Sequence, residues 1–255
     1  MKTLKVHFLP QSATDTDMHG ATTIVIDALR ATTTIVYALA AGARSVTPCL
    51  TIEEARRAAS LLPAGQAVLA GERGGLPIEG FDLGNSPGEF TVAAVREKQV
   101  VMTTTNGTKA LLHCRASDKV LLAAFVNLSA VCEGLFSESK VEVICAGTDG
   151  RITREDVLVA GAIARILTAS EDRSPNDEAR IARDAWLAVA ADACGAELER
   201  RIVAAMGASQ GGANLIAIGL RHDLQWAAQV DRFSIVPRFD AATSLIRAAG
   251  SSPAL

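Results

Sequence analysis

The sequence predicts an α/β fold of three layers, in which helices cover both faces of a mostly parallel sheet. From residue 22 to about residue 169, short apolar runs alternate with segments of helical spacing, and this repeated β-then-α order is typical of parallel sheets. The chain has 255 residues, and 49% of them are hydrophobic. It can therefore bury a large core without disulfides or structural metals.

The predicted strands are continuous apolar runs, as expected for strands that are buried on both faces. They comprise residues 23–27, 45–49, 67–71, 100–104, 119–125 and 141–145. A helix is predicted to begin near Ala31, and Gly42 is well placed to end it. A second helix is predicted over residues 52–61, because Thr51 and Glu54 have the spacing of a capping box.

The composition changes after residue 170. Residues 171–177 are polar, and the Ala-rich chain that follows predicts helices from about residue 178 to residue 229, with breaks near Gly195 and between Gly207 and Gly212. Residues 233–236 predict a final strand. We therefore expect a β/α core at residues 1–170 that carries the functional site. Residues 171–255 are expected to form a mainly helical part, which could pack onto the same domain.

Composition excludes several classes of protein. The formal net charge of −3 gives no broad basic surface, so nucleic acid is not expected as a partner. The five cysteines are odd in number and widely spaced, which indicates reduced thiols rather than a disulfide framework or a zinc site. Neither a signal peptide nor an apolar run of membrane-spanning length is evident. We expect a cytoplasmic protein without membrane contact. The Ala-rich helices could form a contact between subunits, so a homo-oligomer is one possibility.

Ligands of parallel sheets bind beyond the carboxyl ends of the strands, and the first predicted strand is followed by an acid, an arginine and three threonines. Asp27 could bind a metal ion and Arg30 an anionic oxygen. In the structural alternative, the threonines cap the next helix and Asp27 pairs with Arg30. This segment alone leaves both interpretations open.

A glycine-rich connection, residues 72–90, follows the third predicted strand. Its polar residues include Glu72, Arg73, Asp82, Asn85 and Ser86. Glycines allow backbone amides to approach a ligand closely, and a connection of this length inside a compact domain is usually functional. An ordinary surface loop is the alternative, but the position after a strand favours a site.

The fourth predicted strand ends at a segment that opens a helix and suits a phosphate or sulfonate. It contains Thr105, Asn106, Gly107, Thr108 and Lys109. The spacing is not that of a Walker A loop. A plain helix cap with Lys109 in solvent is the structural alternative.

The sixth predicted strand ends at Cys145, which is followed by Gly147 and Thr148. Cys145 and Arg151 have the spacing of the CxxxxxR loop of cysteine-dependent phosphatases, in which a thiolate attacks phosphorus. Asp149 lies inside this loop, however, where its charge would repel a phosphate and raise the thiol pKa. A buried structural role for Cys145 is therefore favoured over a nucleophilic one.

Four motifs in fixed order resemble those of the 2-phosphosulfolactate phosphatase family. They are VIDALRATTT, GERGGLPIEGFDLGNSP, TTTNGT and CAGTDGRITREDVLVAG. The later segments SQGGANL and HDL also resemble the end of the family's sequences, so the likeness covers nearly the whole chain. It implies a magnesium-dependent α/β enzyme that converts 2-phospho-3-sulfolactate and water to 3-sulfolactate and phosphate, a step of coenzyme M biosynthesis.

With this resemblance, the polar residues at the strand ends can be given roles. We expect Asp27 and one or more of Glu72, Asp82 and Asp156 to hold Mg²⁺, and Asp27, Arg30, Glu72 and Asp156 to act in catalysis. The expected substrate-binding residues are Arg30, Thr32, Thr33, Arg73, Asn85, Ser86, Thr105, Asn106, Gly107, Thr108, Lys109, Gly147 and Thr148.

Two chemical routes and two other functions stay open. A carboxylate could activate the attacking water, or Asp27 could form a phospho-aspartate. The substrate could be a different small phosphorylated acid, or the chain could bind such a metabolite without catalysis. The surplus of carboxylates at the strand ends favours a magnesium enzyme over a receptor for anions, which would gain nothing from them.

Overall fold

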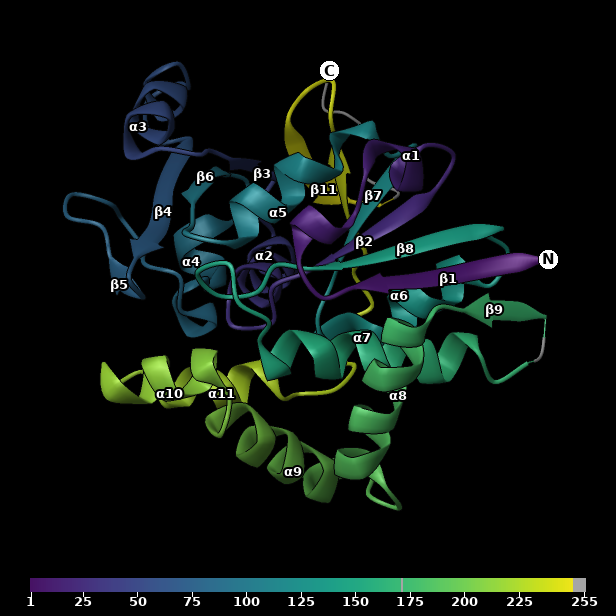
Figure 1. Cartoon of the computed structure of the whole chain (residues 1–255). Helices are drawn as coiled ribbons and strands as arrows, with labels where there is room; N and C mark the ends of the chain where they lie inside the picture. Colours follow the sequence, from purple (N-terminus) through teal and green to yellow (C-terminus); the bar gives the residue numbers. More distant parts are fainter. Residues whose placement is uncertain (171, 250–255) are drawn as a thin grey trace.

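The chain folds around one sheet whose two faces are both covered by helices (Figure 1). The computed structural model describes residues 1–170 and 172–249. Residue 171 and residues 250–255, which belong to the predicted C-terminal part, lie outside the described residues. The arrangement of the layers confirms the predicted three-layer α/β fold.

The sheet has the strand order β5-β4-β6-β3-β11-β10-β7-β2-β8-β1-β9 over the described residues. Pairing is parallel within two groups, β4-β6-β3 and β7-β2-β8-β1-β9. The strands are β1 (Lys2–His7), β2 (Thr22–Ile26), β3 (Ser45–Pro48), β4 (Ala67–Arg73), β5 (Leu76–Pro77), β6 (Gln99–Thr103), β7 (Lys119–Ala123), β8 (Lys140–Cys145), β9 (Arg173–Pro175), β10 (Pro237–Asp240) and β11 (Leu245–Ala248).

The six predicted inner strands correspond to β2, β3, β4, β6, β7 and β8, with ends that differ by one or two residues. Along β2, Ile24 and Ile26 pack into the core that contains α6, α7 and α8, whereas Val25 packs into the core on the other face. Because both faces are buried, these strands have continuous apolar runs instead of an alternating pattern.

The prediction of a final strand at residues 233–236 is wrong. The chain instead forms the hairpin β10–β11, which pairs antiparallel with β7 on one side and β3 on the other and so joins the two parallel groups. The Phe233 ring packs against the Tyr37 ring with centroids 4.9 Å apart, and Phe233 N donates to Val126 O at 2.9 Å. The apolar residues of this segment thus pack, partly buried, against the cores without joining the sheet.

Helices connect the parallel strands and cover the sheet. They are α1 (Asp15–Met18), α2 (Ala31–Ala40), α3 (Ile52–Ser60), α4 (Val92–Val95), α5 (Gly107–His113), α6 (Leu128–Leu135), α7 (Arg154–Leu167), α8 (Asp177–Ala190), α9 (Gly195–Gly207), α10 (Gln210–Ala217) and α11 (His222–Ala227), with the short 3-10 helices η1 (Pro10–Ser12), η2 (Pro87–Glu89), η3 (Cys114–Ala116) and η4 (Phe125–Asn127). Within the described residues, none of these helices has the length and apolar character needed to cross a membrane.

The Ala-rich segment forms four helices, α8 to α11. The breaks at residues 191–194 and 208–209 are close to the predicted ones, whereas the third break, at residues 218–221, is not predicted by the sequence pattern. α8 packs against α7 and β1. α9, α10 and α11 lie together along one side of the molecule (Figure 1). This arrangement brings α10 beside the residues that follow β2, β4 and β6.

Candidate functional site

A cavity of about 330 Å³ lies where the residues after β2, β4, β6 and β8 meet α10. This volume is within the usual range for small-molecule sites. The lining residues are Asp27, Leu29, Arg30, Glu72, Gly74, Gly75, Asn85, Thr105, Asn106, Thr148, Asp149, Gly211, Asn214, Leu215, Ala217 and Ile218. The structure thus brings Asp27, Arg30, Glu72, Asn85, Thr105, Asn106 and Thr148 together, as the sequence predicts.

Asp27 follows β2 directly and is buried. Within the described chain, its carboxylate accepts one hydrogen bond, from Ala31 N at 3.3 Å. Gly107 passes so close that a Cβ there would lie 2.5 Å from Asp27 Oδ2, which explains the glycine at the start of α5. Burial, together with the charges of Glu72 and Glu155, raises the pKa of Asp27 to about 7.

Asp156, in the first turn of α7, has a different environment. Its Oδ1 accepts from Ala28 N at 2.9 Å, and its Oδ2 accepts from Gly147 N at 2.9 Å and from Thr153 Oγ1 at 3.3 Å. These bonds join the ends of β2 and β8. Asp156 does not line the cavity. Its carboxylate thus holds the two loops together from outside the cavity, with three protein donors on its two oxygens.

Glu155 is a buried acid beside these two aspartates that the sequence prediction does not include. Its Oε2 has no hydrogen-bond partner among the described residues, and burial raises the pKa of Glu155 above its ordinary value. The glycine of α10 at position 211 leaves room for it, since a Cβ on Gly211 would collide with Glu155 Oε1. Glu155 therefore backs the wall that α10 contributes to the cavity.

Glu72, at the end of β4, also lines the cavity. Its Oε1 accepts from Thr105 N at 2.7 Å, and its Oε2 accepts from Gly75 N at 2.8 Å and from Thr105 Oγ1 at 3.2 Å. These donors link the β4–β5 turn to the β6–α5 loop. The Glu72 charge is one cause of the raised Asp27 pKa.

Arg30 is buried in the cavity wall beyond β2, after a cis peptide bond with Leu29. Its Nη1 donates to Asp223 Oδ2 at 2.7 Å, and its Nη2 donates to Gly75 O at 2.6 Å. The alternative in which Asp27 pairs with Arg30 is thus not found among the described residues. Asp223, on α11, is the acid that balances the Arg30 charge.

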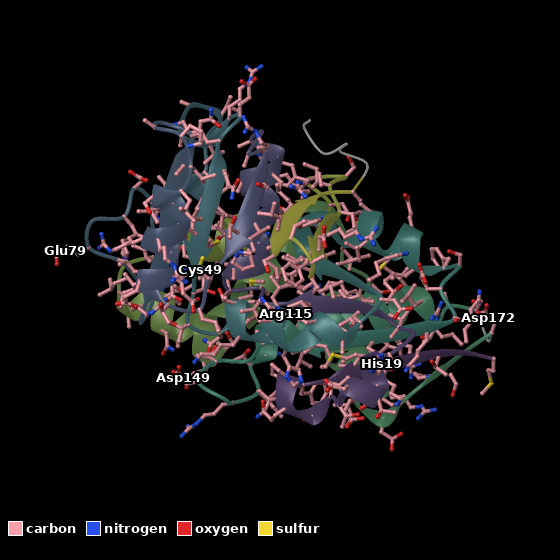
Figure 2. All side chains as sticks on the ribbon, turned by 90° about the horizontal axis from the view of Figure 1, so that it is seen from above. His19, Cys49, Glu79, Arg115, Asp149 and Asp172 are labelled. Carbon is pink, nitrogen blue, oxygen red and sulfur yellow. The ribbon has the colours of Figure 1, made fainter. Side chains whose placement is uncertain are left out.

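The lining of the cavity carries more negative than positive charge. Asp27, Glu72 and Asp149 are acidic, and Arg30, already paired with Asp223, is the basic residue among the described lining. Figure 2 shows Asp149 on the same side of the molecule as Glu79 of the glycine-rich connection and away from Asp172. Because acidic residues outnumber basic ones in the described lining, a phosphorylated ligand would need a cation in this cavity.

The cavity also contains an amide oxygen without a partner. Asn85 is buried, and its Oδ1 has no hydrogen-bond partner among the described residues. Among those residues, no three Asp, Glu, His or Cys side chains form a metal-binding group. Mg²⁺, however, often takes one or two carboxylates and keeps waters for its other positions. Asp27, Glu72 and Asn85 are therefore the lining residues whose oxygens match the ligands that this ion prefers.

Several predicted site residues have structural contacts instead. The hydroxyl of Thr32 donates to Asp27 O at 2.9 Å, that of Thr33 to Ala28 O at 2.8 Å. Arg73 Nη1 donates to Glu72 O at 2.7 Å, and Thr108 Oγ1 accepts from Thr104 N at 3.2 Å. Ser86 and Gly147 bond to Asp223 and Asp156, respectively, and Gly107 packs against Ala31 and Asp27. These residues shape the loops around the cavity without lining it.

Asp82 and Lys109 lie away from the cavity lining. Asp82 Oδ2 accepts from Leu69 N at 2.8 Å, beside β4. Lys109 is exposed on α5, as the structural alternative for this segment predicts. Neither side chain is therefore placed to contact a ligand in the cavity.

Cys145 is fully buried at the end of β8 and belongs to the core that contains α7. Burial raises the pKa of its thiol well above the ordinary value, and the Asp156 and Glu155 charges act in the same direction. A thiolate nucleophile is disfavoured in this environment. The predicted burial of Cys145 is confirmed, and it supports a structural role for this residue.

Comparison with known proteins identifies the family of this chain. The sequence profile described as 2-phosphosulpholactate phosphatase matches residues 7–242. The chain belongs to the 2-phosphosulpholactate phosphatase family. This membership confirms the resemblance found in the motifs, and with it the enzyme class, a phosphatase.

Family relatives named "Probable 2-phosphosulfolactate phosphatase" are similar over most of their length. One from Synechococcus sp. (strain JA-3-3Ab) is 40% identical over 86% of this chain and 88% of its own. One from Pseudothermotoga lettingae is 39% identical over 92% and 95%, and one from Deinococcus radiodurans is 40% identical over 92% of each chain. The similarity thus includes both the strand-end motifs and the C-terminal helices.

Proposed function

We propose that this chain hydrolyses 2-phospho-3-sulfolactate to 3-sulfolactate and phosphate with the help of Mg²⁺. The main support is the composition of the cavity lining, in which Asp27, Glu72 and Asp149 are acidic while the one basic residue of the described lining, Arg30, is paired with Asp223. A substrate with phosphate, carboxylate and sulfonate groups would be repelled there unless a dication were bound with it. The names of the relatives support the choice of substrate.

In this proposal, Asp27, Glu72 and the free amide oxygen of Asn85 hold the magnesium ion. When bound, Mg²⁺ would neutralise the phosphate charge and favour departure of the alkoxide. Arg30 uses its remaining N–H groups to bind an anionic oxygen of the substrate. The amide groups of Asn106 and Asn214, which also line the cavity, are further donors for the carboxylate or sulfonate.

Asp27 is the carboxyl group that performs the chemistry in either of two routes. In one, it accepts a proton from the attacking water as the bond between phosphorus and the sulfolactate oxygen breaks, and the departing alkoxide takes up a proton. In the other, its oxygen displaces that alkoxide from phosphorus, the alkoxide takes up a proton from water, and a second water hydrolyses the phospho-aspartate. Borohydride reduction of protein quenched during turnover distinguishes them. Conversion of residue 27 to homoserine identifies the covalent route, whereas an unmodified Asp27 under single-turnover conditions assigns the attack to water.

The proposal includes a cytoplasmic location and a role in coenzyme M biosynthesis. All five cysteines are free in the described chain, which is typical of a reducing compartment. The place in the pathway follows from the proposed substrate.

Substrate choice is tested by comparing phosphate release from 2-phospho-3-sulfolactate with release from 2-phospholactate, which lacks only the sulfonate. We expect kcat/KM to be at least tenfold higher for 2-phospho-3-sulfolactate than for 2-phospholactate. The hydrogen bonds that the charged sulfonate would make are worth roughly 1.5–3 kcal/mol and are lost with 2-phospholactate. Equal or faster hydrolysis of 2-phospholactate would support phosphatase activity but contradict 2-phospho-3-sulfolactate as the substrate. A different small phosphorylated acid would then be the next candidate.

A further inference from the structure

Asp223 lies outside the cavity lining but contacts two of the segments that form it. It is 1% exposed. Its Oδ2 accepts from Arg30 Nη1 at 2.7 Å, and its Oδ1 accepts from Ser86 Oγ. Arg30 follows β2, and Ser86 is the neighbour of Asn85 in the glycine-rich connection. One carboxylate on α11 thus joins two walls that are far apart in the sequence.

Arg30 is held at a second point as well. Its Nη2 donates to Gly75 O at 2.6 Å. A guanidinium group is planar and carries five N–H donors in a fixed arrangement. Two contacts at different nitrogens therefore fix its orientation, and the other N–H groups remain for a ligand in the cavity that Arg30 lines.

The position of Asp223 does not depend on Arg30. Its neighbour Leu224 and Ala227, one turn further along α11, are buried in the core. The hydroxyl of Tyr37 donates to Trp226 O at 3.2 Å. These contacts anchor α11 independently of the Arg30–Asp223 ion pair.

We propose that Asp223 is a positioning residue, which orients the Arg30 guanidinium toward an anionic oxygen of the substrate and holds Ser86, and with it Asn85, at the cavity wall. The choice of substrate rests on the proposed function. Asp223 also keeps Arg30 from its other anionic neighbours, Asp27 and Glu72, which line the same cavity. An ion pair between Arg30 and Asp27 would occupy the carboxylate needed for chemistry.

A double-mutant cycle tests this inference. Asp223→Asn keeps the shape of the side chain and removes its charge, so we expect kcat/KM to fall roughly 10- to 100-fold, as for a small displacement of a catalytic group. Arg30→Met should also lower kcat/KM, because it removes the guanidinium that Asp223 orients. When both are changed, kcat/KM should stay within about 2-fold of Arg30→Met alone, because no guanidinium is left to orient and the amide oxygen that Asp223→Asn introduces can still accept a hydrogen bond from the Ser86 hydroxyl.

Glu142→Gln is the matched control. Glu142 is fully buried and pairs with His7 at 2.8 Å, but it does not line the cavity. We expect kcat/KM within about 2-fold of the parent in both the wild-type and Arg30→Met backgrounds. Melting temperatures of all variants separate loss of folded protein from loss of rate. Additive effects of Asp223→Asn and Arg30→Met would overturn the positioning role.

Binding of inorganic phosphate with Mg²⁺, measured by calorimetry on the same variants, separates this inference from the proposed function. If the wild type releases no phosphate from 2-phospho-3-sulfolactate but the cycle is non-additive for phosphate binding, the function fails and the role of Asp223 stands. If the wild type releases phosphate from 2-phospho-3-sulfolactate and Asp223→Asn has no effect, the proposed function stands and the role of Asp223 fails. Absence of both turnover and phosphate binding contradicts both.

Discussion

Two buried aspartates at neighbouring strand ends differ in what their oxygens contact. Asp156 accepts hydrogen bonds from two backbone amides and one hydroxyl and so joins the loops after β2 and β8. Asp27 accepts one long bond, from Ala31 N at 3.3 Å, in the described chain and lines the cavity. Asp156 therefore supports the site from outside the cavity, whereas Asp27 lines the cavity with acceptor positions that the protein leaves free and is available for a metal or for chemistry.

The first prediction concerns the reactive member of the pair. Asp27→Asn should reduce kcat by roughly 10²–10⁴-fold, the range expected when an acid–base group is lost, while far-UV circular dichroism remains unchanged. Phosphate release measures kcat directly. Turnover within tenfold of the wild type would remove Asp27 from the chemistry and make the comparison with Asp156 meaningless.

The second prediction uses the raised pKa of Asp27. Its value of about 7 exceeds the ordinary 3.8, so between these values the unfolded state ionises while the folded state keeps its proton. The free energy of unfolding therefore falls as pH rises from about 4 to 7. Replacing Asp27 by Asn removes this penalty, which amounts to about 1.4 kcal/mol per pKa unit.

Urea unfolding with EDTA present tests this second prediction. The Asp27→Asn variant should match the wild type at pH 4 and be more stable by a few kcal/mol at pH 8. If the variant is equally or less stable at pH 8, burial does not hold Asp27 in its neutral form.

The third prediction concerns the supporting member. In Asp156→Asn, one amide NH₂ would face a backbone N–H of Ala28 or Gly147. A buried donor left without an acceptor costs about 1–3 kcal/mol, so the free energy of unfolding at pH 7 should drop by that amount. Activity per folded molecule should fall less than in Asp27→Asn. A larger loss of activity at full stability would show that Asp156 reacts directly.

The smallest effects are expected where polar residues lie outside the cavity. Asp82→Asn and Lys109→Ala should each change kcat/KM less than about twofold, as for surface substitutions within ±0.5 kcal/mol. Steady-state kinetics at several Mg²⁺ concentrations checks this. A raised magnesium requirement in Asp82→Asn would return Asp82 to the metal site.

The strands and the strand-end half of the site could be predicted from the sequence. The continuous apolar runs specify buried parallel strands, and such strands deliver their following residues to one edge. Asp27, Glu72 and Asn106 line the cavity for this reason. In contrast, Asp82 and Lys109 have suitable side chains, but the course of the loop and the face of the helix direct them elsewhere.

The contribution of the C-terminal helices could not be predicted from spacing. Asp223 lies 193 residues from Arg30, and Gly211 meets Glu155 only because α10 folds back over the strand ends. Such contacts leave no local pattern. Two signals were available in the sequence, the adjacent acids Glu155 and Asp156 and the glycine pair at residues 211 and 212. The glycines indicate close packing, but neither signal shows which segments come into contact.

The most direct test is phosphate release from 2-phospho-3-sulfolactate by the purified protein with Mg²⁺, with EDTA, and with Mg²⁺ restored after EDTA. We predict turnover that EDTA abolishes and Mg²⁺ restores, because the acidic cavity binds a phosphate only together with a cation. Turnover that persists in EDTA would contradict the magnesium site formed by Asp27, Glu72 and Asn85.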